Sequence, residues 1–413
     1  MKYEKDWMRK NEKNKNKLIK HASEIKEDLL KSYESDYASL LLPTEKKFIK
    51  KVAEILKTKK EYKHLIVIGI GGSNLGTQAI IEAIHGKDHL INKNKKIFFA
   101  DTTDPDNITS IKKQVKNKKF LVLLISKSGT TTESLANFEV ILKEIPKQER
   151  TKRIITITDK NTELEKYSNK KGYLCLEIPK KVGGRYSVLS YVGLVPLAFA
   201  EIKIKNLLKG ASDAIKNFDK NNIAMEGALD LFHNYENNKK INDIFLFNND
   251  LESLGKWYRQ LMGESIGKKY TKTKKQAHIG ITPTVSIGST DLHSVGQLYM
   301  GGPKDKFTTF ISLEKQTKVI IPKNEDAILK NIQGLSFKRI LQAIMQGTMT
   351  AYKKNKLPYN HYTLKEKTEY ELGYFMQTKM LEIILLAHLL NVNPFDQPSV
   401  EEYKKETRKL LKT

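Results

Sequence analysis

The chain has 413 residues, a formal net charge of +26 at pH 7 and a single cysteine, Cys175. One cysteine excludes an internal disulfide, and the longest apolar runs are too short to span a bilayer. The first residues are charged throughout and contain no apolar stretch of signal-peptide length, so we expect a soluble, cytoplasmic protein without a membrane partner.

The positive charge raises the question of a nucleic-acid partner. Only seven of the 73 basic residues are arginine, and the lysines are spread along the whole chain. Proteins that read bases favour arginine, because its planar guanidinium can form two hydrogen bonds to one base edge. This composition disfavours a nucleic-acid partner, although the charge would help to attract an anionic substrate.

Residues 1–62 are predicted to be helical, because apolar residues recur three and four positions apart at 16–33 and at 43–57. Strands and helices then alternate. The predicted strands are 63–70, 95–102, 119–128, 153–159 and 172–178. The predicted helices between them are 73–86, 105–115, 131–145 and 161–172. This alternation is typical of a parallel sheet with helices on both faces.

A helical stretch at 188–238 leads to a second α/β set. Its strand candidates are 242–249, 278–288, 307–314, 318–322 and 358–364. Its predicted helices are 250–267, 336–355, 368–390 and, at the end of the sequence, the amphipathic segment 399–413. The lysine-rich segment 267–276 is predicted to be an exposed loop.

The predicted fold class is therefore α/β, with two doubly wound parallel-sheet domains and helical extensions at both ends. The expected boundaries are 1–60 for an N-terminal helical arm, 61–190 for the first sheet domain, 191–238 for connecting helices, 239–390 for the second sheet domain and 391–413 for a C-terminal helix.

Ligands of open parallel sheets bind outside the carboxyl ends of the strands, and the first loop there is the turn in LIVIGIGGSNLG, residues 65–76. The dinucleotide fingerprint requires a glycine at the sixth position from Gly69, where this chain has Asn74, and no Gly-Lys-Ser/Thr follows to make a Walker loop. Two interpretations remain. The backbone N–H groups and the Ser73 hydroxyl form an anion site, or Ser73 simply caps a helix.

The second loop, SKSGTTTES at residues 126–134, is richer in donors. The hydroxyls of Ser126, Ser128 and Thr131, the ammonium of Lys127 and free amides at a helix N-terminus can together surround one phosphate dianion. A capping box within TTTE would explain one hydroxyl and leave the others without a role. This loop therefore favours a phosphate site.

The third loop is VGGRYS, residues 182–187. Gly183 and Gly184 let the backbone approach a ligand closely, and Arg185 adds a fixed positive charge. The alternative is a solvated arginine on a surface turn, which the scarcity of arginine in this chain disfavours.

These loops and three further motifs resemble a known family. GIGGSNLG, SKSGTTTES, VGGRYS, GESIGK, GSTDLHSVGQ and FDQPSVEEYK occur in an order and spacing similar to glucose-6-phosphate isomerase in its shorter bacterial form. The likeness covers the chain from about residue 60 onward. It implies two sugar-isomerase (SIS) domains, a homodimer, no metal and no organic cofactor.

The resemblance implies interconversion of glucose 6-phosphate and fructose 6-phosphate by ring opening and proton transfer through a cis-enediolate. Glu264 matches the family's base, and Arg185 matches the group that stabilises the enediolate. His293, contributed by the neighbouring subunit, and Lys404 match the ring-opening residues. The implied substrate contacts are Gly72, Ser73, Ser126, Lys127, Ser128, Thr131, Gly184 and Gln260.

The chain departs from the family pattern at a few positions. Ser128 and Ser134 stand where threonine is usual, and Ile266 stands where many relatives have a polar or acidic residue. The lysine-rich stretch between Glu264 and His293 is longer than in close bacterial relatives. None of these differences removes a catalytic group.

Two other functions remain open from the residues alone. Asp101 follows a predicted strand and could imitate the ribose-binding acid of a nicotinamide-dependent dehydrogenase, although the glycine spacing argues against it. A non-catalytic sugar-phosphate sensor would share the phosphate site but would not need Glu264, His293 and Lys404 together.

Overall fold

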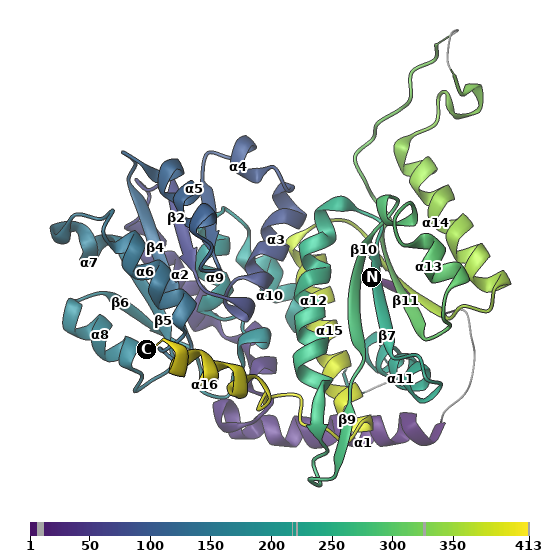
Figure 1. Cartoon of the computed structure of the whole chain (residues 1–413), viewed down its shortest axis with the longest axis horizontal. Coiled ribbons are helices and arrows are strands. Elements are labelled where there is room, and N and C mark those ends of the chain that lie inside the picture. Colours follow the sequence, from purple (N-terminus) through teal and green to yellow (C-terminus); the bar gives the residue numbers. More distant parts are fainter. Residues whose placement is uncertain (6–11, 217, 220–221, 325–327, 412–413) are drawn as a thin grey trace.

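The structure is a computed structural model that describes residues 1–5, 12–216, 218–219, 222–324 and 328–411 (Figure 1). Its first sheet is parallel throughout. In spatial order its strands are β3 (Lys96–Ala100), β2 (His64–Ile68), β4 (Phe120–Ile125), β5 (Ile154–Thr158) and β6 (Leu174–Glu177).

Helices cover both faces of this sheet, because its strands are apolar on both sides. Leu65 and Val67 point into one core, while Ile66 and Ile68 point into the other. The first core also contains α2 (Lys46–Lys57), α3 (Leu75–His85) and α9 (Tyr191–Phe199), and the second contains α5 (Pro105–Val115), α6 (Thr132–Leu142) and α8 (Glu163–Lys171). The predicted doubly wound parallel sheet is confirmed.

The second sheet has the order β1 (Lys2–Lys5), β12 (Tyr359–Leu364), β11 (Lys306–Leu313), β7 (Ile241–Leu246) and β10 (Thr282–Ile287). All neighbouring pairs are parallel except β1 and β12. One face packs against α13 (Gly296–Gly301) and α14 (Phe337–Lys354), and the other against α11 (Ile223–Glu236), α12 (Glu252–Ile266) and α15 (Glu369–Leu389).

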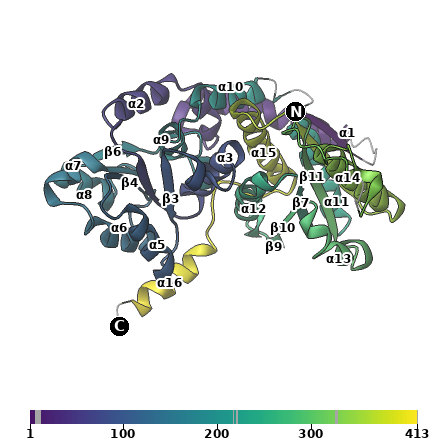
Figure 2. The ribbon, with the colours of Figure 1, turned by 90° about the horizontal axis from the view of Figure 1, so that it is seen from above.

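Helix α15 lies between the two sheets, beside α10 (Ile204–Ile215) and α12 (Figures 1 and 2). Its apolar residues occur on all sides rather than along one stripe, and nearly the whole helix is buried. The predicted helix at 368–390 therefore forms the interior of the molecule. No helix in the described ranges is both long enough and apolar enough to cross a membrane.

Four predictions of local structure were wrong or incomplete. Residues 2–5 form strand β1 rather than a helix, and 318–322 form no strand, since only Ile320 makes an isolated bridge with Ser336. The predicted strand 278–288 is divided into β9 (Gln276–Ile279) and β10. The predicted lysine-rich loop contains β8 (Lys268–Tyr270), which pairs with β9 as a hairpin. The last predicted helix is α16 (Val400–Leu410), and residues 412–413 lie outside the described residues.

These errors have physical causes. Strand β1, KYEK, lies at a sheet edge, where charged side chains are favoured and no apolar alternation is required. Segment 318–322 has the apolar composition of a buried strand, but Val319 and Ile320 are exposed. Composition alone does not distinguish a buried strand from an apolar segment on the surface.

A stacked histidine pair joins α1 (Glu12–Asp28) to the end of α15. The rings of His21 and His388 lie 3.7 Å apart at an interplanar angle of 15°. Burial lowers the pKa of His21, and burial together with the neighbouring His21 lowers the pKa of His388 to about 4. The charged and titratable groups that face the pair are Glu24, Tyr37, Lys17 and Lys272. Both rings are therefore neutral at pH 7 in the folded protein.

Acidification should weaken this contact between helices. A histidine whose pKa is lower in the folded chain than in the unfolded chain adds stability above about pH 6.5 and loses it as the pH falls toward the folded pKa. We expect the melting temperature of His388→Gln to fall less between about pH 7 and pH 5 than the melting temperature of the unchanged chain. His278→Gln, which alters an exposed histidine, is the control. Identical shifts for all three proteins would contradict this role of the pair.

Candidate active site

Two of the three predicted loops leave neighbouring strands at the same edge of the first sheet. The chain proceeds from β2 outward to β3 and returns across β2 to β4, so β2 and β4 flank the point where the strand order reverses. After β2 comes the short turn η3 (Gly71–Ser73). A Cβ on Gly69 would lie 2.7 Å from the Cβ of Ser73 and 3.2 Å from the carbonyl oxygen of Ile125, the last residue of β4. The two loops are therefore in close contact.

The loop after β4 presents hydroxyls at the start of α6. The Ser126 hydroxyl is buried and lies 2.9 Å from the hydroxyl of Thr131, while Ser128 accepts a hydrogen bond from the backbone of Thr130 (3.3 Å). Thr131 stands at the N-cap of α6, but its side chain makes no capping bond. The capping alternative is therefore not what the structure shows, and the first N–H groups of α6 and the nearby hydroxyls form a potential anion site.

The ammonium of Lys127, predicted to bind phosphate, instead has partners within the chain. Its ammonium donates to the backbone carbonyls of Lys180 (2.7 Å) and Val182 (2.9 Å), at the start of the third loop. Burial lowers the pKa of Lys127, and the charge of Arg185 acts in the same direction. The side chain thus ties the second loop to the third.

The first and third loops touch through their backbones. The third loop contains the turn η5 (Gly184–Tyr186), and a Cβ on Gly72 would lie only 2.2 Å from the carbonyl carbon of Gly184. The Ser187 hydroxyl donates to the Gly72 carbonyl (3.4 Å). Glycine is needed at position 72 because any side chain would separate the two loops.

Arg185 is almost fully buried, with 3% of its surface exposed. Its Nε donates to the Ser265 hydroxyl (2.8 Å), and its Nη1 donates to Glu264 Oε2 (3.2 Å) and to Gln397 Oε1 (2.7 Å). Its Nη2 donates to the carbonyls of Pro394 (2.5 Å) and Asp396 (3.0 Å). A guanidinium has five N–H donors, and all five have an acceptor here.

Glu264 lies near the C-terminal end of α12, beside these loops. Gln260, one turn earlier, donates to Glu264 Oε1 (3.0 Å), and Arg185 donates to Oε2. The Gln260 amide is in turn next to the first loop, since a Cβ on Gly71 would lie 2.8 Å from its Nε2. The Glu264 side chain keeps 31% of its surface exposed. It is a fixed carboxylate with an open side, as a proton-transfer base requires.

Among the described residues, neither His293 nor Lys404 makes a hydrogen bond or an ion pair with Glu264. His293 is exposed and follows the turn η7 (Thr290–Leu292) beyond β10. Lys404 lies on α16, which buries none of its residues, and its ammonium pairs with Glu401 of the same helix (2.8 Å). The structure therefore assembles Glu264, Gln260, Arg185 and the three loops, and leaves these two residues apart from them.

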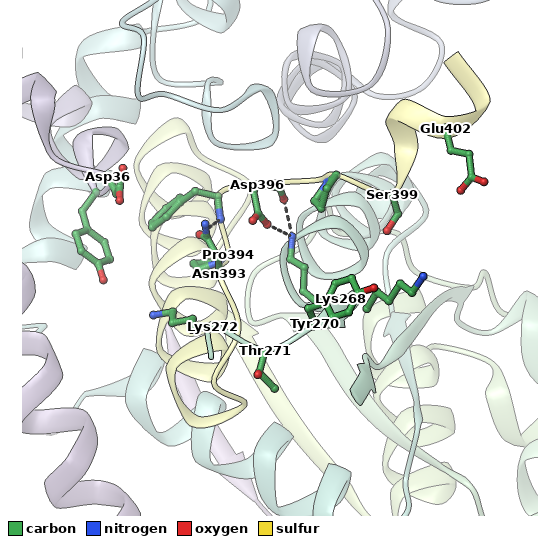
Figure 3. A pocket seen from close by; sticks show the side chains of 14 residues that line it. Asp36, Lys268, Tyr270, Thr271, Lys272, Asn393, Pro394, Asp396, Ser399 and Glu402 are labelled. Atoms are coloured by element: carbon green, nitrogen blue, oxygen red, sulfur yellow. Dashed lines mark hydrogen bonds and ion pairs between the residues drawn. The ribbon is translucent and has the colours of Figure 1, made fainter. Parts of the chain in front are cut away.

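A cavity of about 610 Å³ lies beside this centre rather than within it (Figure 3). Its walls come from residues 268–272, from Asp36 and Tyr37, and from the C-terminal residues 393–396, 398–399 and Glu402 of α16. Neither Glu264 nor any residue of the three loops lines it. The cavity shares Lys268, Pro394 and Asp396 with the surroundings of Arg185.

The chain matches the sequence model described as phosphoglucose isomerase over residues 41–413. It is 37% identical over 385 residues to the glucose-6-phosphate isomerase of Mycoplasma capricolum, and this alignment covers 89% of the chain and 87% of that protein. The chain belongs to the phosphoglucose isomerase family. Isomerisation of glucose 6-phosphate to fructose 6-phosphate, a step shared by glycolysis and gluconeogenesis, is the activity of this family.

Solved structures agree with this fold. A hypothetical protein of Thermus thermophilus is similar with a TM-score of 0.86 and 30% identity, covering 96% of this chain and 95% of that one. A glucose-6-phosphate isomerase of Chlamydia trachomatis has the same fold, with a TM-score of 0.75, 21% identity and coverage of 89% and 73%.

Membership of the phosphoglucose isomerase family removes the dehydrogenase alternative, and the geometry agrees. Asp101 Oδ2 accepts a hydrogen bond from the Asn74 amide (2.9 Å). Asn74 is itself buried beside the first glycine turn. The acid that could have bound a ribose instead holds this turn against the end of β3.

Three side chains at the site were not predicted as functional residues. Gln397 contacts Arg185, Ser265 contacts both Arg185 and Tyr186, and Lys268 contacts the backbone of Glu264. All three lie within motifs that carried the family resemblance, FDQPSVEEYK and GESIGK. Each of these motifs therefore contains a predicted catalytic residue and, beside it, residues that contact its surroundings.

Replacing Gly72 by alanine should separate the first and third loops, because the new methyl would overlap the Gly184 backbone. We expect kcat/KM to fall about 100-fold through displacement of Arg185 and the first loop. Isomerase kinetics and denaturant unfolding would measure this. Gly347→Ala is the control, since nothing lies within 4 Å of a Cβ there and a helix interior gains up to about 1 kcal/mol from alanine. Full activity of Gly72→Ala would show that this backbone contact is not needed.

Proposed function

We propose that this chain interconverts glucose 6-phosphate and fructose 6-phosphate with Glu264 as the base that moves the proton. One observation supports this most directly: the Glu264 carboxylate is fixed by Arg185 and Gln260 beside the three loops, with one side left open. Family membership supplies the reaction, and this arrangement supplies a base next to a potential phosphate site.

The phosphate provides the anchor in this proposal. Backbone N–H groups at the start of α6 and the hydroxyls of Ser126, Ser128 and Thr131 would bind its oxygens, with Gly72 and Ser73 closing the other side. Lys127 would contribute through its backbone, because its ammonium binds carbonyls of the third loop. Binding a part of the substrate that does not react fixes the carbon atoms against Glu264.

Proton transfer follows from the position of Glu264. In the open-chain aldose, the carboxylate removes the proton from C2, and the electrons form the C1–C2 double bond of a cis-enediolate. The same group, now protonated, returns the proton to C1, while O2 loses its hydroxyl proton and O1 gains one, which gives the ketose. Arg185 places its fixed charge beside Glu264, where it would stabilise the enediolate oxygen. Gln260 and Gly184 would border the sugar.

Ring opening is assigned to His293 and Lys404. We propose that His293 acts in the site of a second copy of the chain, since its side chain is exposed and free to meet a partner. Lys404 would reach the site from α16, which is tethered to Arg185 only through the segment before it.

A homodimer is consistent with the surface around His293. Figure 1 shows residues 314–324 and 328–336, between β11 and α14, extending away from the body of the protein. This segment, α14 and the neighbouring α13 expose a group of large apolar side chains, namely Leu298, Val319, Ile320, Ile328, Leu329, Leu335, Phe337 and Ile344. A surface of this kind marks an interaction site, and a second copy of the chain would both cover it and bring His293 to a partner's Glu264.

The proposed reaction needs no metal and no organic cofactor, because a carboxylate and a fixed cation suffice for proton transfer. We place the activity in the cytoplasm, where the family's glycolytic role belongs, and we propose no nucleic-acid partner.

Replacing Glu264 by glutamine should abolish turnover, because the amide cannot accept the C2 proton. We expect kcat to fall at least about 1,000-fold, while sugar-phosphate affinity changes little because the phosphate contacts remain. A coupled assay of glucose 6-phosphate formed from fructose 6-phosphate, with a chelator present during the isomerase step, would measure this. Glu252→Gln, at the other end of α12, is the control. Substantial turnover by Glu264→Gln would exclude it as the base.

Mixing two inactive variants tests the proposed dimer. If His293 acts in the partner's site, a heterodimer of Glu264→Gln and His293→Gln subunits contains one intact site and one doubly altered site. Random exchange of subunits should then restore about a quarter of the unchanged activity. If both residues act within one chain, the mixture stays inactive and the proposal of sharing fails. Unmixed variants kept under the same conditions are the control.

A further inference from the structure

Lys268 is a buried lysine at the end of the helix that carries Glu264. Its side chain is 6% exposed and turns back along α12, so that its ammonium donates to the Glu264 carbonyl (2.9 Å). The same ammonium pairs with Asp396 Oδ1 (2.9 Å) and donates to the Asp396 carbonyl, as Figure 3 shows. Its three donors are thus all used, one on the catalytic helix and two on the C-terminal segment.

The C-terminal segment, residues 394–397, is held from two directions. Lys268 binds Asp396 from the second half of the chain, and Arg185 binds the carbonyls of Pro394 and Asp396 from the first half. Both cations therefore share one acceptor, the Asp396 carbonyl. Gln397, the next residue, binds Arg185 with its side chain.

Hydrogen bonds and an ion pair fix Asp396 at the open side of this segment, whereas its neighbour Phe395 is also held by packing against the rings of Tyr37 and Tyr186. The 610 Å³ cavity is bordered by Pro394, Asp396 and Lys268 (Figure 3). Asp396 therefore has room to move into the cavity once its hydrogen bonds are lost. Asp396 keeps half of its side chain exposed, so the buried partner in this ion pair is Lys268.

The same segment determines where α16 can reach. Helix α16 buries none of its residues, so within the described chain its path is set by residues 393–399. Lys404 lies five residues beyond this segment, in the second turn of α16. Any shift of Asp396 is transmitted to Gln397 directly and to Lys404 through the start of α16.

We propose that Lys268 is a positioning residue for isomerisation: it fastens the C-terminal segment to the helix of the base and thereby sets the position of Gln397 and Lys404 relative to Glu264. This inference rests on the proposed roles of Glu264 and Lys404. A contribution to stability alone accounts less well for the residue, because the desolvation of a buried ion pair offsets much of its attraction.

Three variants separate positioning from stability. Lys268→Met keeps the stem and removes the charge, Lys268→Arg keeps the charge, and Lys269→Met changes an exposed neighbour that contacts Tyr270. Each is assayed as the full chain for kcat and KM with fructose 6-phosphate. Its affinity for an open-chain six-carbon polyol phosphate, which needs no ring opening, is measured by inhibition.

For Lys268→Met we expect kcat to fall about 10- to 100-fold, while polyol phosphate affinity changes less than about threefold, because the phosphate loops are untouched. Lys268→Arg should regain most of the activity, and Lys269→Met should behave like the unchanged chain. An unaltered kcat in folded Lys268→Met, or equal losses of kcat and inhibitor affinity, would overturn the proposal.

Asp396→Ala gives a second measurement if Lys268→Met fails to fold. It should show the same loss of kcat, and the double variant should lose no more than either single one, because both break one contact. Additive losses would overturn the proposal. Glu264→Gln is assayed alongside: turnover by that variant would contradict the assignment of the base, whereas its inactivity combined with normal Lys268→Met kinetics would contradict only the positioning role.

Discussion

The guanidinium of Arg185 has been removed from water, and five protein acceptors replace the water that it lost. These acceptors come from the end of α12 and from residues 394–397, while Arg185 itself belongs to the loop after the first sheet. Desolvating a cation is costly unless every donor is bonded, so each of these parts is constrained to its place by the others. The planar guanidinium has five N–H donors, so one arginine can bind all of these parts at once, whereas a lysine has only three donors.

The backbone contact between Gly72 and Gly184 lies next to Arg185 and joins the first loop to the third. Because the third loop touches the first, and Lys127 ties the second loop to the third, all three loops form one unit with Arg185 at its base. Glu264 meets this unit through hydrogen bonds to Arg185 and Gln260. The candidate site therefore joins the loops of the first sheet, proposed to bind phosphate, to the end of α12, which carries the proposed base Glu264.

Much of this could be predicted from the sequence, because the signals were local. Apolar strands such as FLVLLI and the glycine and hydroxyl loops at their ends identified the first sheet and its ligand edge. Motif position selected Glu264, Gln260 and Arg185, and these lie together.

The features that could not be predicted depend on distant parts of the chain. The edge strand β1 has no apolar pattern of its own, and Val319 and Ile320 have the composition of a strand without its surroundings. The acceptors of Arg185 include backbone carbonyls, which leave no trace in the sequence. The roles of His293 and Lys404 stay predictions, because they depend on a second subunit and on the reach of α16.

The pairing of β1 with β12 has a consequence for the order in which the molecule is assembled. Residues 2–5 leave the ribosome more than 350 residues before their partner strand, residues 359–364. The hydroxyl of Tyr3 binds Asp230, and the Met1 amine lies 3.5 Å from Glu371, so the surroundings of β1 are also completed late. Until β1 pairs with it, the outer edge of β12 is an unpaired strand edge that another chain could pair with. A strand that is made early thus closes the sheet late and shields its edge from misassembly.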